Sequence, residues 1–335
     1  MRAYVTNTQC DTVAVIDTAT NTLVAIVPVG DRPFGVAITP DGTRAYVANF
    51  GGTVSVIDTV TNTVIATVPV GGSPRGVAIR PDGARVYIAN QSNSLSVIDT
   101  GTNTVVDTVL VGLPALAVAI TPDGSRLYVT RSNETITVID TATGMVVSTI
   151  PVPRAMNLFG VVITPDGTRA YVEDTGVLLI IIDTASNTIV GHILHTQTLH
   201  DALTITPDGA RIYASSPSHP TVSVIDTSTN AVVNIIPFGN APTDSAVTPD
   251  GARLYLSNVL NTVSVIDTAT NTLVTTIPNI ACPETSAHKI AIAEVPQVPK
   301  SKSDCKDGGY LEFGPPAGPF RNQGQCISYV AAHSQ

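Results

Sequence analysis

Residues 76–111 read GVAIRPDGARVYIANQSNSLSVIDTGTNTVVDTVLV, and this stretch decides the fold. It contains four short segments rich in Val, Ile, Thr and Tyr, and clusters of Pro, Gly, Asp and Asn separate them. Segments of this composition predict β-strands, and the clusters predict tight turns. We therefore expect one four-stranded antiparallel sheet, whose strands we name A to D in chain order: Gly76 to Arg80, Arg85 to Ala89, Leu95 to Asp99, and Thr104 to Val111.

The same unit recurs along the chain at a nearly constant period. An Asp-Thr dipeptide ends each expected C strand, with its Asp at 17, 58, 99, 140, 183, 226 and 267, in steps of 41, 41, 41, 43, 43 and 41 residues. Pro-Asp-Gly joins A to B in six units, because Pro presets φ, Asp binds its own backbone and Gly accepts a left-handed conformation. One slot of the B strand, two residues after an Arg, holds Tyr4, Tyr46, Tyr87, Tyr128, Tyr171, Tyr213 and Tyr255.

These units must close into a ring. A unit of about 40 residues cannot bury both of its faces, so the units stack, and stacked twisted antiparallel sheets close radially. The fold class is therefore all-β, a seven-bladed β-propeller. The chain begins at a B strand, Ala3 to Asn7, and its last repeat-like segment, His288 to Ala293, is a single A strand. We expect them to pair, so that one C-terminal and three N-terminal strands complete the seventh blade. The propeller then covers residues 1–294, and a linker and small C-terminal tail cover 295–335.

The repeat resembles that of the YVTN family of β-propellers. The family is named for the string that stands here as Tyr4-Val5-Thr6-Asn7, and the resemblance runs from residue 2 to about 293. This string, the Val-Ile-Asp-Thr turn and Pro-Asp-Gly recur in the same order along the chain. The resemblance implies a seven-bladed ring, often found on archaeal or bacterial surfaces or in the periplasm. It implies no single activity, because one fold hosts many functions.

The composition argues against nucleic acid as a partner. The net charge is −9, and all four Lys residues (Lys289, Lys300, Lys302 and Lys306) lie near the C-terminus, so the body lacks the Lys clusters that bind phosphates. The longest apolar run, Val177 to Ile182, is far shorter than the roughly 20 residues that span a bilayer. We expect a monomer with no transmembrane segment.

The four cysteines favour disulfides and an oxidising compartment, since they show no metal-site spacing. Cys10 belongs to the B–C loop of the closing blade and Cys282 to the D–A loop that enters it. These loops share one face, so we expect a Cys10–Cys282 disulfide, with two unpaired thiols as the alternative. Cys305 and Cys326 enclose a Gly- and Pro-rich segment, which reads as a disulfide-held tail similar to those of some bacterial secreted proteins. We therefore expect an extracellular or periplasmic protein, with no signal peptide ahead of the first strand in this chain.

Departures from the repeat mark the candidate site, because folding alone requires no variation among equivalent positions. The start of each A strand is expected at the mouth of a central channel, on the face that carries the B–C and D–A loops, where propellers present variable side chains to ligands. The equivalent positions there are Phe34, Arg75, Leu116, Phe159, Asp201, Thr243 and His288. The predicted ligand-binding residues are Arg75, Phe34, Phe159, Asp244 and Lys289. The catalytic candidates are His200, Asp201 and His288; the metal-binding candidates are His195, His200, His219 and His288; and neighbouring loops contribute Glu173 and Asp174.

Two classes of function remain open. The first is an exported or surface-associated binding scaffold, whose loop face holds a protein, a glycan or a small molecule. We favour it because strongly templated blades leave little room for a catalytic constellation. The alternative is a hydrolase or lyase, lactonase-like or metal-assisted, with His200 or His288 as acid/base, and it rests on analogy with other propellers. We predict no cofactor, although imidazole and carboxylate ligands would suit a divalent metal.

Overall fold

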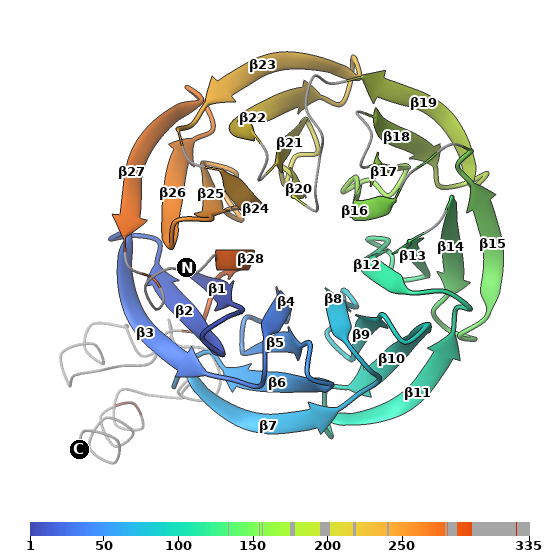
Figure 1. Ribbon diagram of the computed structural model, residues 1–335, viewed down its shortest axis with the longest axis horizontal. Helices are drawn as coiled ribbons and strands as arrows, with labels where there is room; N and C mark the ends of the chain where they lie inside the picture. Colours follow the sequence, from blue (N-terminus) through green and yellow to red (C-terminus); the bar gives the residue numbers. More distant parts are fainter. Residues whose placement is uncertain are drawn as a thin grey trace.

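The computed structural model describes residues 1–132, 134–153, 155, 157–174, 178–194, 202–216, 219–239, 241–278, 280, 287–296 and 326. Within these residues, 28 strands form seven four-stranded antiparallel sheets. The sheets surround a common axis, which confirms the predicted seven-bladed β-propeller (Figure 1). This part of the chain contains no helix of the length and apolarity needed to cross a membrane.

Each blade runs outward from its A strand beside the axis to its D strand at the rim (Figure 1). The A strands are β28 (Ala287–Ala293), β4 (Pro33–Ile38), β8 (Pro74–Ile79), β12 (Ala115–Ile120), β16 (Leu158–Ile163), β20 (Leu203–Ile205) and β24 (Pro242–Val247). The B strands are β1 (Arg2–Asn7), β5 (Arg44–Asn49), β9 (Arg85–Asn90), β13 (Arg126–Arg131), β17 (Arg169–Asp174), β21 (Arg211–Ser216) and β25 (Arg253–Asn258). The C strands are β2 (Thr12–Asp17), β6 (Thr53–Asp58), β10 (Ser94–Asp99), β14 (Thr135–Asp140), β18 (Leu178–Asp183), β22 (His219–Asp226) and β26 (Thr262–Asp267). The D strands are β3 (Thr22–Pro28), β7 (Thr63–Pro69), β11 (Thr104–Leu110), β15 (Val146–Pro151), β19 (Thr188–Leu194), β23 (Ala231–Pro237) and β27 (Thr272–Pro278).

The seventh blade is assembled from both ends of the chain. Its strand order is β28-β1-β2-β3, and β28 lies beside β1 in Figure 1. The two strands are antiparallel, with Ile290 opposite Val5 and Ala293 opposite Arg2. The predicted closure by one C-terminal and three N-terminal strands is therefore confirmed.

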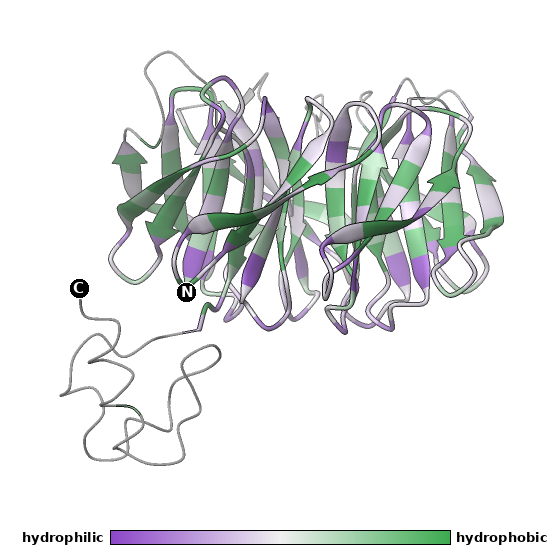
Figure 2. Ribbon diagram, turned by 90° about the horizontal axis from the view of Figure 1, so that it is seen from below, coloured by the Kyte–Doolittle hydropathy of each residue, from purple (hydrophilic) through white to green (hydrophobic). Residues whose placement is uncertain are grey.

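Apolar side chains fill the space between neighbouring blades. Figure 2 shows hydrophobic residues concentrated along the strands and hydrophilic residues mostly toward the turns. One cluster joins Val13 and Val15 of the closing blade to Ala45 and Val47 of the next blade, and Tyr4 belongs to the same cluster. Because each blade can bury its two faces only against its neighbours, the ring is one cooperative unit of structure.

A buried tyrosine on the B strand reaches into the next blade. In six blades its hydroxyl lies 2.6 to 3.4 Å from Oδ1 of an Asn in the C–D turn of that blade. These Asn residues have φ between 52° and 55°, a left-handed conformation that Asn tolerates better than most residues. Burial raises the pKa of Tyr4 and Tyr255 to about 12, so both hydroxyls stay protonated donors. The pairs are Tyr4–Asn62, Tyr46–Asn103, Tyr128–Asn187, Tyr171–Asn230, Tyr213–Asn271 and, across the ring closure, Tyr255–Asn21.

The interface between the β8–β11 blade and the β12–β15 blade departs from this pattern. Gly144, with φ of 68°, occupies the turn position of the Asn and offers no side chain to Tyr87. The neighbouring Arg85 forms an ion pair with Asp99 of its own blade. Tyr87 is 4% exposed, whereas the six tyrosines that have an Asn partner are 0% exposed. This interface therefore lacks the Tyr–Asn hydrogen bond of the other six.

The residues after β28 take the place of the seventh Pro-Asp-Gly turn. In the other blades the turn Gly packs against a Pro of the preceding blade's turn, as Gly83 does against Pro40. Gly42 faces the end of the closing blade instead, and a Cβ added to it would collide with the carbonyl oxygen of Glu294. The next residue, Val295, is 6% exposed and belongs to the apolar cluster between the closing blade and the β4–β7 blade, which also contains Tyr4. Residues 294 and 295 thus seal the point where the two chain ends meet.

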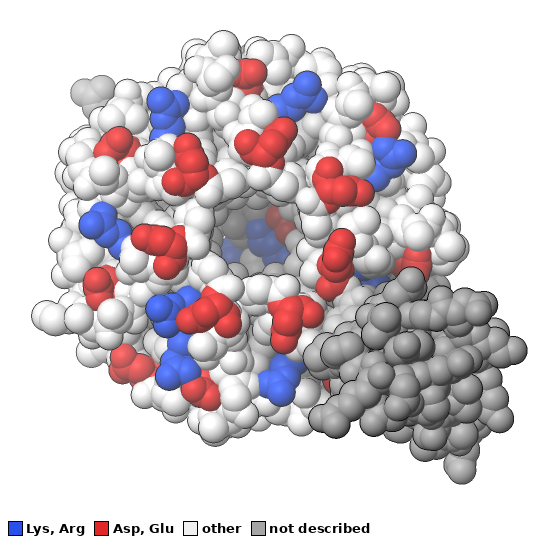
Figure 3. All heavy atoms as spheres, turned by 180° about the vertical axis from the view of Figure 1, so that it is seen from behind, with Lys and Arg blue, Asp and Glu red and all other residues white. Residues whose placement is uncertain are grey.

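The ends of the strands form two different faces. The turn face carries the A–B and C–D turns, and the loop face carries the B–C and D–A connections. On the turn face, the carboxylate of Asp41 accepts hydrogen bonds from Oγ1 of Thr39 at 2.6 Å and from the N–H of Thr43 at 3.0 Å. Acidic residues circle the channel opening in Figure 3, which views the ring from behind. The equivalent bonds in the other Pro-Asp-Gly turns make these carboxylates structural.

Candidate functional site: the channel mouth

The second to fourth residues of the A strands converge at the loop-face end of the channel and line a cavity of about 190 Å³. The third position is small in five blades, because neighbouring A strands approach closely there. A Cβ on Gly35 would collide with the carbonyl oxygen of Arg75, and one on Gly76 would lie 3.0 Å from Cα of Ala117. Gly160 and Ala202 occupy the same position in two further blades. The fold therefore requires small residues where these strands meet.

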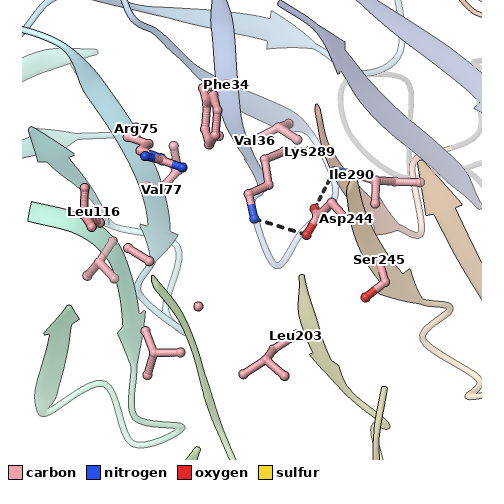
Figure 4. A pocket seen from close by; sticks show the side chains of 16 residues that line it. Phe34, Val36, Arg75, Val77, Leu116, Leu203, Asp244, Ser245, Lys289 and Ile290 are labelled. Carbon is pink, nitrogen blue, oxygen red and sulfur yellow. Dashed lines mark hydrogen bonds and ion pairs between the residues drawn. The ribbon is translucent and has the colours of Figure 1, made fainter. Parts of the chain in front are cut away.

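The two remaining blades carry a buried ion pair at this third position. Nζ of Lys289 lies 3.2 Å from Oδ1 of Asp244, and Asp244 is 6% exposed (Figure 4). The other carboxylate oxygen of Asp244 accepts the backbone N–H of Ile290 at 2.9 Å. Both of these partners lie on β28, so the carboxylate of Asp244 connects β24 to β28. In Figure 4 the Lys289 side chain extends toward the open centre of the cavity.

Thr6 positions the strands that carry Lys289 and Phe34. Its Oγ1 accepts the backbone N–H of Lys289 at 2.9 Å and donates to the carbonyl oxygen of Phe34 at 2.8 Å. Thr130 does the same for another channel strand, because its Oγ1 donates to the carbonyl oxygen of Phe159 at 2.6 Å. Hydroxyl side chains on B strands therefore fix the A strands of the following blades at the mouth.

Arg75 lies against two aromatic rings from different blades. Its guanidinium carbon is 4.4 Å from the ring centroid of Phe34 and 5.3 Å from that of Phe159. Both distances are within the range of cation–π contacts. Such contacts hold the planar guanidinium in place, and its N–H donors lie in its plane. Figure 4 shows the Arg75 side chain on the wall of the cavity next to Phe34.

Apolar side chains form most of the rest of the cavity wall. Val36, Val77, Leu116, Leu203 and Ile290 line it on different strands. Figure 4 places Leu116 and Leu203 on the sides away from the ion pair. Among the described residues, the mouth therefore combines an apolar wall with the cationic side chains of Arg75 and Lys289 and the carboxylate of Asp244, an arrangement that can orient a small ligand.

The structure brings together most of the predicted ligand-binding residues. Phe34, Arg75, Asp244 and Lys289 line the cavity, and Phe159 contacts Arg75. Thr243 is engaged elsewhere, because its Oγ1 donates to the carbonyl oxygen of Ser257 at 3.1 Å. Sequence reasoning missed the fourth-position wall residues, such as Leu203 and Ile290. Their signal was the alternation along each A strand, which places the second and fourth residues on the same side.

The prediction that Glu173 and Asp174 belong to a loop is wrong, because both are strand residues. They are the last two residues of β17, and they are 0% and 5% exposed. Oε2 of Glu173 accepts the N–H of Gly160 at 3.2 Å, so the carboxylate serves the pairing of β16 with β17. Because the Glu173 carboxylate binds the backbone of its own blade, it stabilises the sheet.

The predicted catalytic and metal-binding residues fall outside the described part of the structure. His195, His200 and Asp201 lie outside the described residues, and only the backbone of His219 and His288 is described. Among the described residues, no group of three or more His, Cys, Asp or Glu side chains could hold a metal ion. The acid/base and metal predictions therefore stay predictions.

Two cysteines of the predicted disulfide pairs lie in the described residues. Cys10 and Cys326 are both disulfide-bonded, and Cys326 is 0% exposed. Cys282 and Cys305 lie outside the described residues, so the predicted pairings remain predictions.

Comparison with known proteins identifies the fold. No family model and no curated protein matches the chain. A functionally unknown protein from Desulfotomaculum acetoxidans DSM 771 is 20% identical, with a TM-score of 0.77 over 88% of this chain and 99% of that one. Hydrazine synthase of Kuenenia stuttgartiensis is 25% identical, with a TM-score of 0.66 over 73% and 86% of the two chains. Dihydro-heme d1 dehydrogenase NirN, solved in complex with DHE, is 16% identical, with a TM-score of 0.64 over 87% and 74%. The chain thus shares its β-propeller fold with proteins of different function.

Proposed function

We propose that this chain is an exported or surface-associated binding scaffold of the YVTN-repeat type, which holds a partner or ligand at its loop face. The observation that carries the proposal is the cavity at the channel mouth. It lies where the blades depart from their repeat, and a few convergent polar groups stand over an apolar wall. Binding sites for small ligands commonly combine these features.

The distribution of polar contacts supports a binding role for the loop face. On the turn face the repeated side chains are engaged in folding, since turn carboxylates bind their own backbones and tyrosines bind the next blade. At the mouth, by contrast, Arg75 stands at a position that holds Phe or Leu in three other blades, and Lys289 at a position that holds Gly or Ala in five. Charged groups at such positions favour recognition over folding.

The disulfide-bonded state of Cys10 and Cys326 supports export, because disulfides persist mainly in oxidising compartments. We propose the pairings Cys10–Cys282 and Cys305–Cys326, so that one bond clasps the ring closure and the other holds the tail. Peptide mapping of protein that has been alkylated without reductant would identify the linked peptides. A Cys10–Cys326 peptide would contradict this pairing.

The binding role can be tested by screening the purified chain against peptides, glycans and small molecules in parallel. A Leu116→Trp variant enlarges a side chain on the cavity wall, and Val106→Trp makes a similar change on the outer strand β11, where Val106 is 51% exposed. We expect a binder that the Leu116→Trp variant loses and the Val106→Trp variant keeps. Absence of any such binder, or turnover of a substrate that His200 or His288 substitution abolishes, would refute the scaffold.

A further inference from the structure

We propose that the ligand of the channel mouth is a small alcohol, an uncharged molecule with one hydroxyl group on a hydrocarbon body, and that its hydroxyl pairs with that of Ser245. This inference rests on the proposed function, because it names the chemical class of ligand for the same site. It follows from a polar residue that interrupts an otherwise aliphatic ring around the cavity.

The fourth-position residues of the seven A strands form a ring, and all seven line the cavity. Six of them are aliphatic, whereas the β24 blade carries a serine at this position. Blade packing does not call for the serine, since six equivalent sites are filled by Val, Leu or Ile. The ring consists of Val36, Val77, Val118, Val161, Leu203, Ser245 and Ile290.

The hydroxyl of Ser245 is buried without a partner. The residue is 6% exposed, and its Oγ makes no hydrogen bond within the described part of the chain. A buried hydroxyl left unpaired costs free energy, which an aliphatic side chain at the same place would not. Figure 4 shows the Ser245 side chain on the cavity wall, between Ile290 and Leu203. Because rotation about χ1 moves Oγ along this wall without moving the backbone, a group in the cavity can supply the missing bond.

The charged groups beside Ser245 favour a neutral ligand. Nζ of Lys289 lies 3.2 Å from Oδ1 of Asp244, and Oδ2 of Asp244 accepts the N–H of Ile290 at 2.9 Å. The two charges therefore balance each other within the wall. A charged ligand group would lose hydration against six aliphatic side chains, whereas a neutral group pairs with the serine hydroxyl at lower cost. A ligand hydroxyl suits the serine best, because each can both donate and accept.

The cavity defines the rest of the ligand. Its volume of about 190 Å³ is less than the roughly 300 Å³ at which pockets for drug-sized ligands begin. The ligand is therefore small. The aliphatic ring favours a hydrocarbon body, since binding then removes apolar surface of both partners from water.

Calorimetric titration of the full chain with benzyl alcohol tests this proposal, with toluene as the match that lacks the hydroxyl. The test compares the unaltered chain with Ser245→Ala. We expect this variant to bind benzyl alcohol at least about fivefold more weakly, because the ligand hydroxyl loses its partner in a buried site. Toluene should bind both proteins equally.

The stability of the unliganded variant provides a second measurement. Removal of an unpaired buried hydroxyl should leave the melting temperature of Ser245→Ala unchanged or raise it. A lower melting temperature would show that the hydroxyl serves the fold, and would overturn the assignment of Ser245 to a ligand.

Ser92→Ala is the matched control, because Ser92 is an exposed serine in a B–C loop of the same face and does not line the cavity. This variant is expected to bind benzyl alcohol as the unaltered chain does. Absence of benzyl alcohol binding, unchanged affinity in Ser245→Ala, or an equal loss for alcohol and toluene overturns the inference. A binder that depends on Leu116 and not on Ser245 would leave the scaffold proposal standing, whereas a screen without any binder fails both.

Discussion

Replacing Gly144 by Asn is expected to stabilise the propeller by completing its ring of Tyr–Asn hydrogen bonds. Gly144 has φ of 68°, close to the 52° to 55° of the Asn residues at the same turn position in the other blades. A Cβ at Gly144 would lie 3.2 Å from a carboxylate oxygen of Asp107, whose exposed side chain can move aside. The new side chain would then meet the hydroxyl of Tyr87, as Asn103 meets Tyr46 at 2.8 Å.

The expected gain is about 1 kcal/mol in the free energy of unfolding. A neutral hydrogen bond contributes about 0.5 to 1.5 kcal/mol net. Loss of glycine entropy from the unfolded chain adds about 0.4 to 1 kcal/mol, and the residual strain of Asn at positive φ offsets part of it. For a chain of this size, 1 kcal/mol corresponds to roughly 2 °C in the melting temperature.

Denaturant unfolding of four proteins measures this effect as a double-mutant cycle: the unaltered chain, Gly144→Asn, Tyr87→Phe and the double variant. We expect most of the gain to vanish in the Tyr87→Phe background, because the hydroxyl supplies the bond. Asn103→Gly is the reverse change at a complete interface and is expected to cost about 1 kcal/mol. A Gly144→Asn protein that is no more stable, or a gain that persists without the Tyr87 hydroxyl, would refute the reasoning.

Three further predictions concern the turns and the ring closure. Hydrogen bonds, above all from Thr121, lower the pKa of Asp123 to about 2, so its contribution to stability is complete above pH 4 and is lost as the pH falls toward 2; the denaturation midpoint should drop over that window, and less steeply in Asp123→Asn. Val295→Ala removes buried methyl groups at the ring closure and is expected to cost about 2 kcal/mol in unfolding free energy, whereas Glu294→Gln on the exposed neighbour should cost almost nothing; equal effects of the two would contradict the sealing role. Gly35→Ala drives a methyl group into the backbone of the next A strand and is expected to cost about 1 to 3 kcal/mol, so an unchanged melting temperature would show that the strands can separate.

The architecture could be predicted because the strand composition, the turn sequences and the period of the repeat all indicate the same fold. The chain begins with the B strand Ala3 to Asn7, which lacks an A strand before it, and ends its repeats with the A strand His288 to Ala293, which lacks a B strand after it. The two segments can complete one blade only if the ring is closed. The same alignment placed Arg75 at the channel mouth, since equivalent positions in a ring face the same axis. The period of the repeat therefore predicted both the strands and the position of the site residues.

Contacts between blades could not be predicted in the same way. A repeat shows that Tyr46 and Asn103 recur, but the period is the same whether the tyrosine meets the Asn of its own blade or of the next one. Glu173 was misplaced for a related reason. Glu173 differs from the residues at the equivalent positions of the repeat, as a site residue would. Only the hydrogen bond from the Gly160 N–H shows that its carboxylate stabilises the sheet.

The seal formed by residues 294 and 295 also bears on where such a ring can be cut. Since these residues imitate an A–B turn, the gap in the backbone lies at a place that is equivalent to six intact turns. A circularly permuted gene that bridges this gap and starts after any other Pro-Asp-Gly would keep every strand pairing. Any blade could therefore come first along the gene, provided that the cyclic order of the blades is kept.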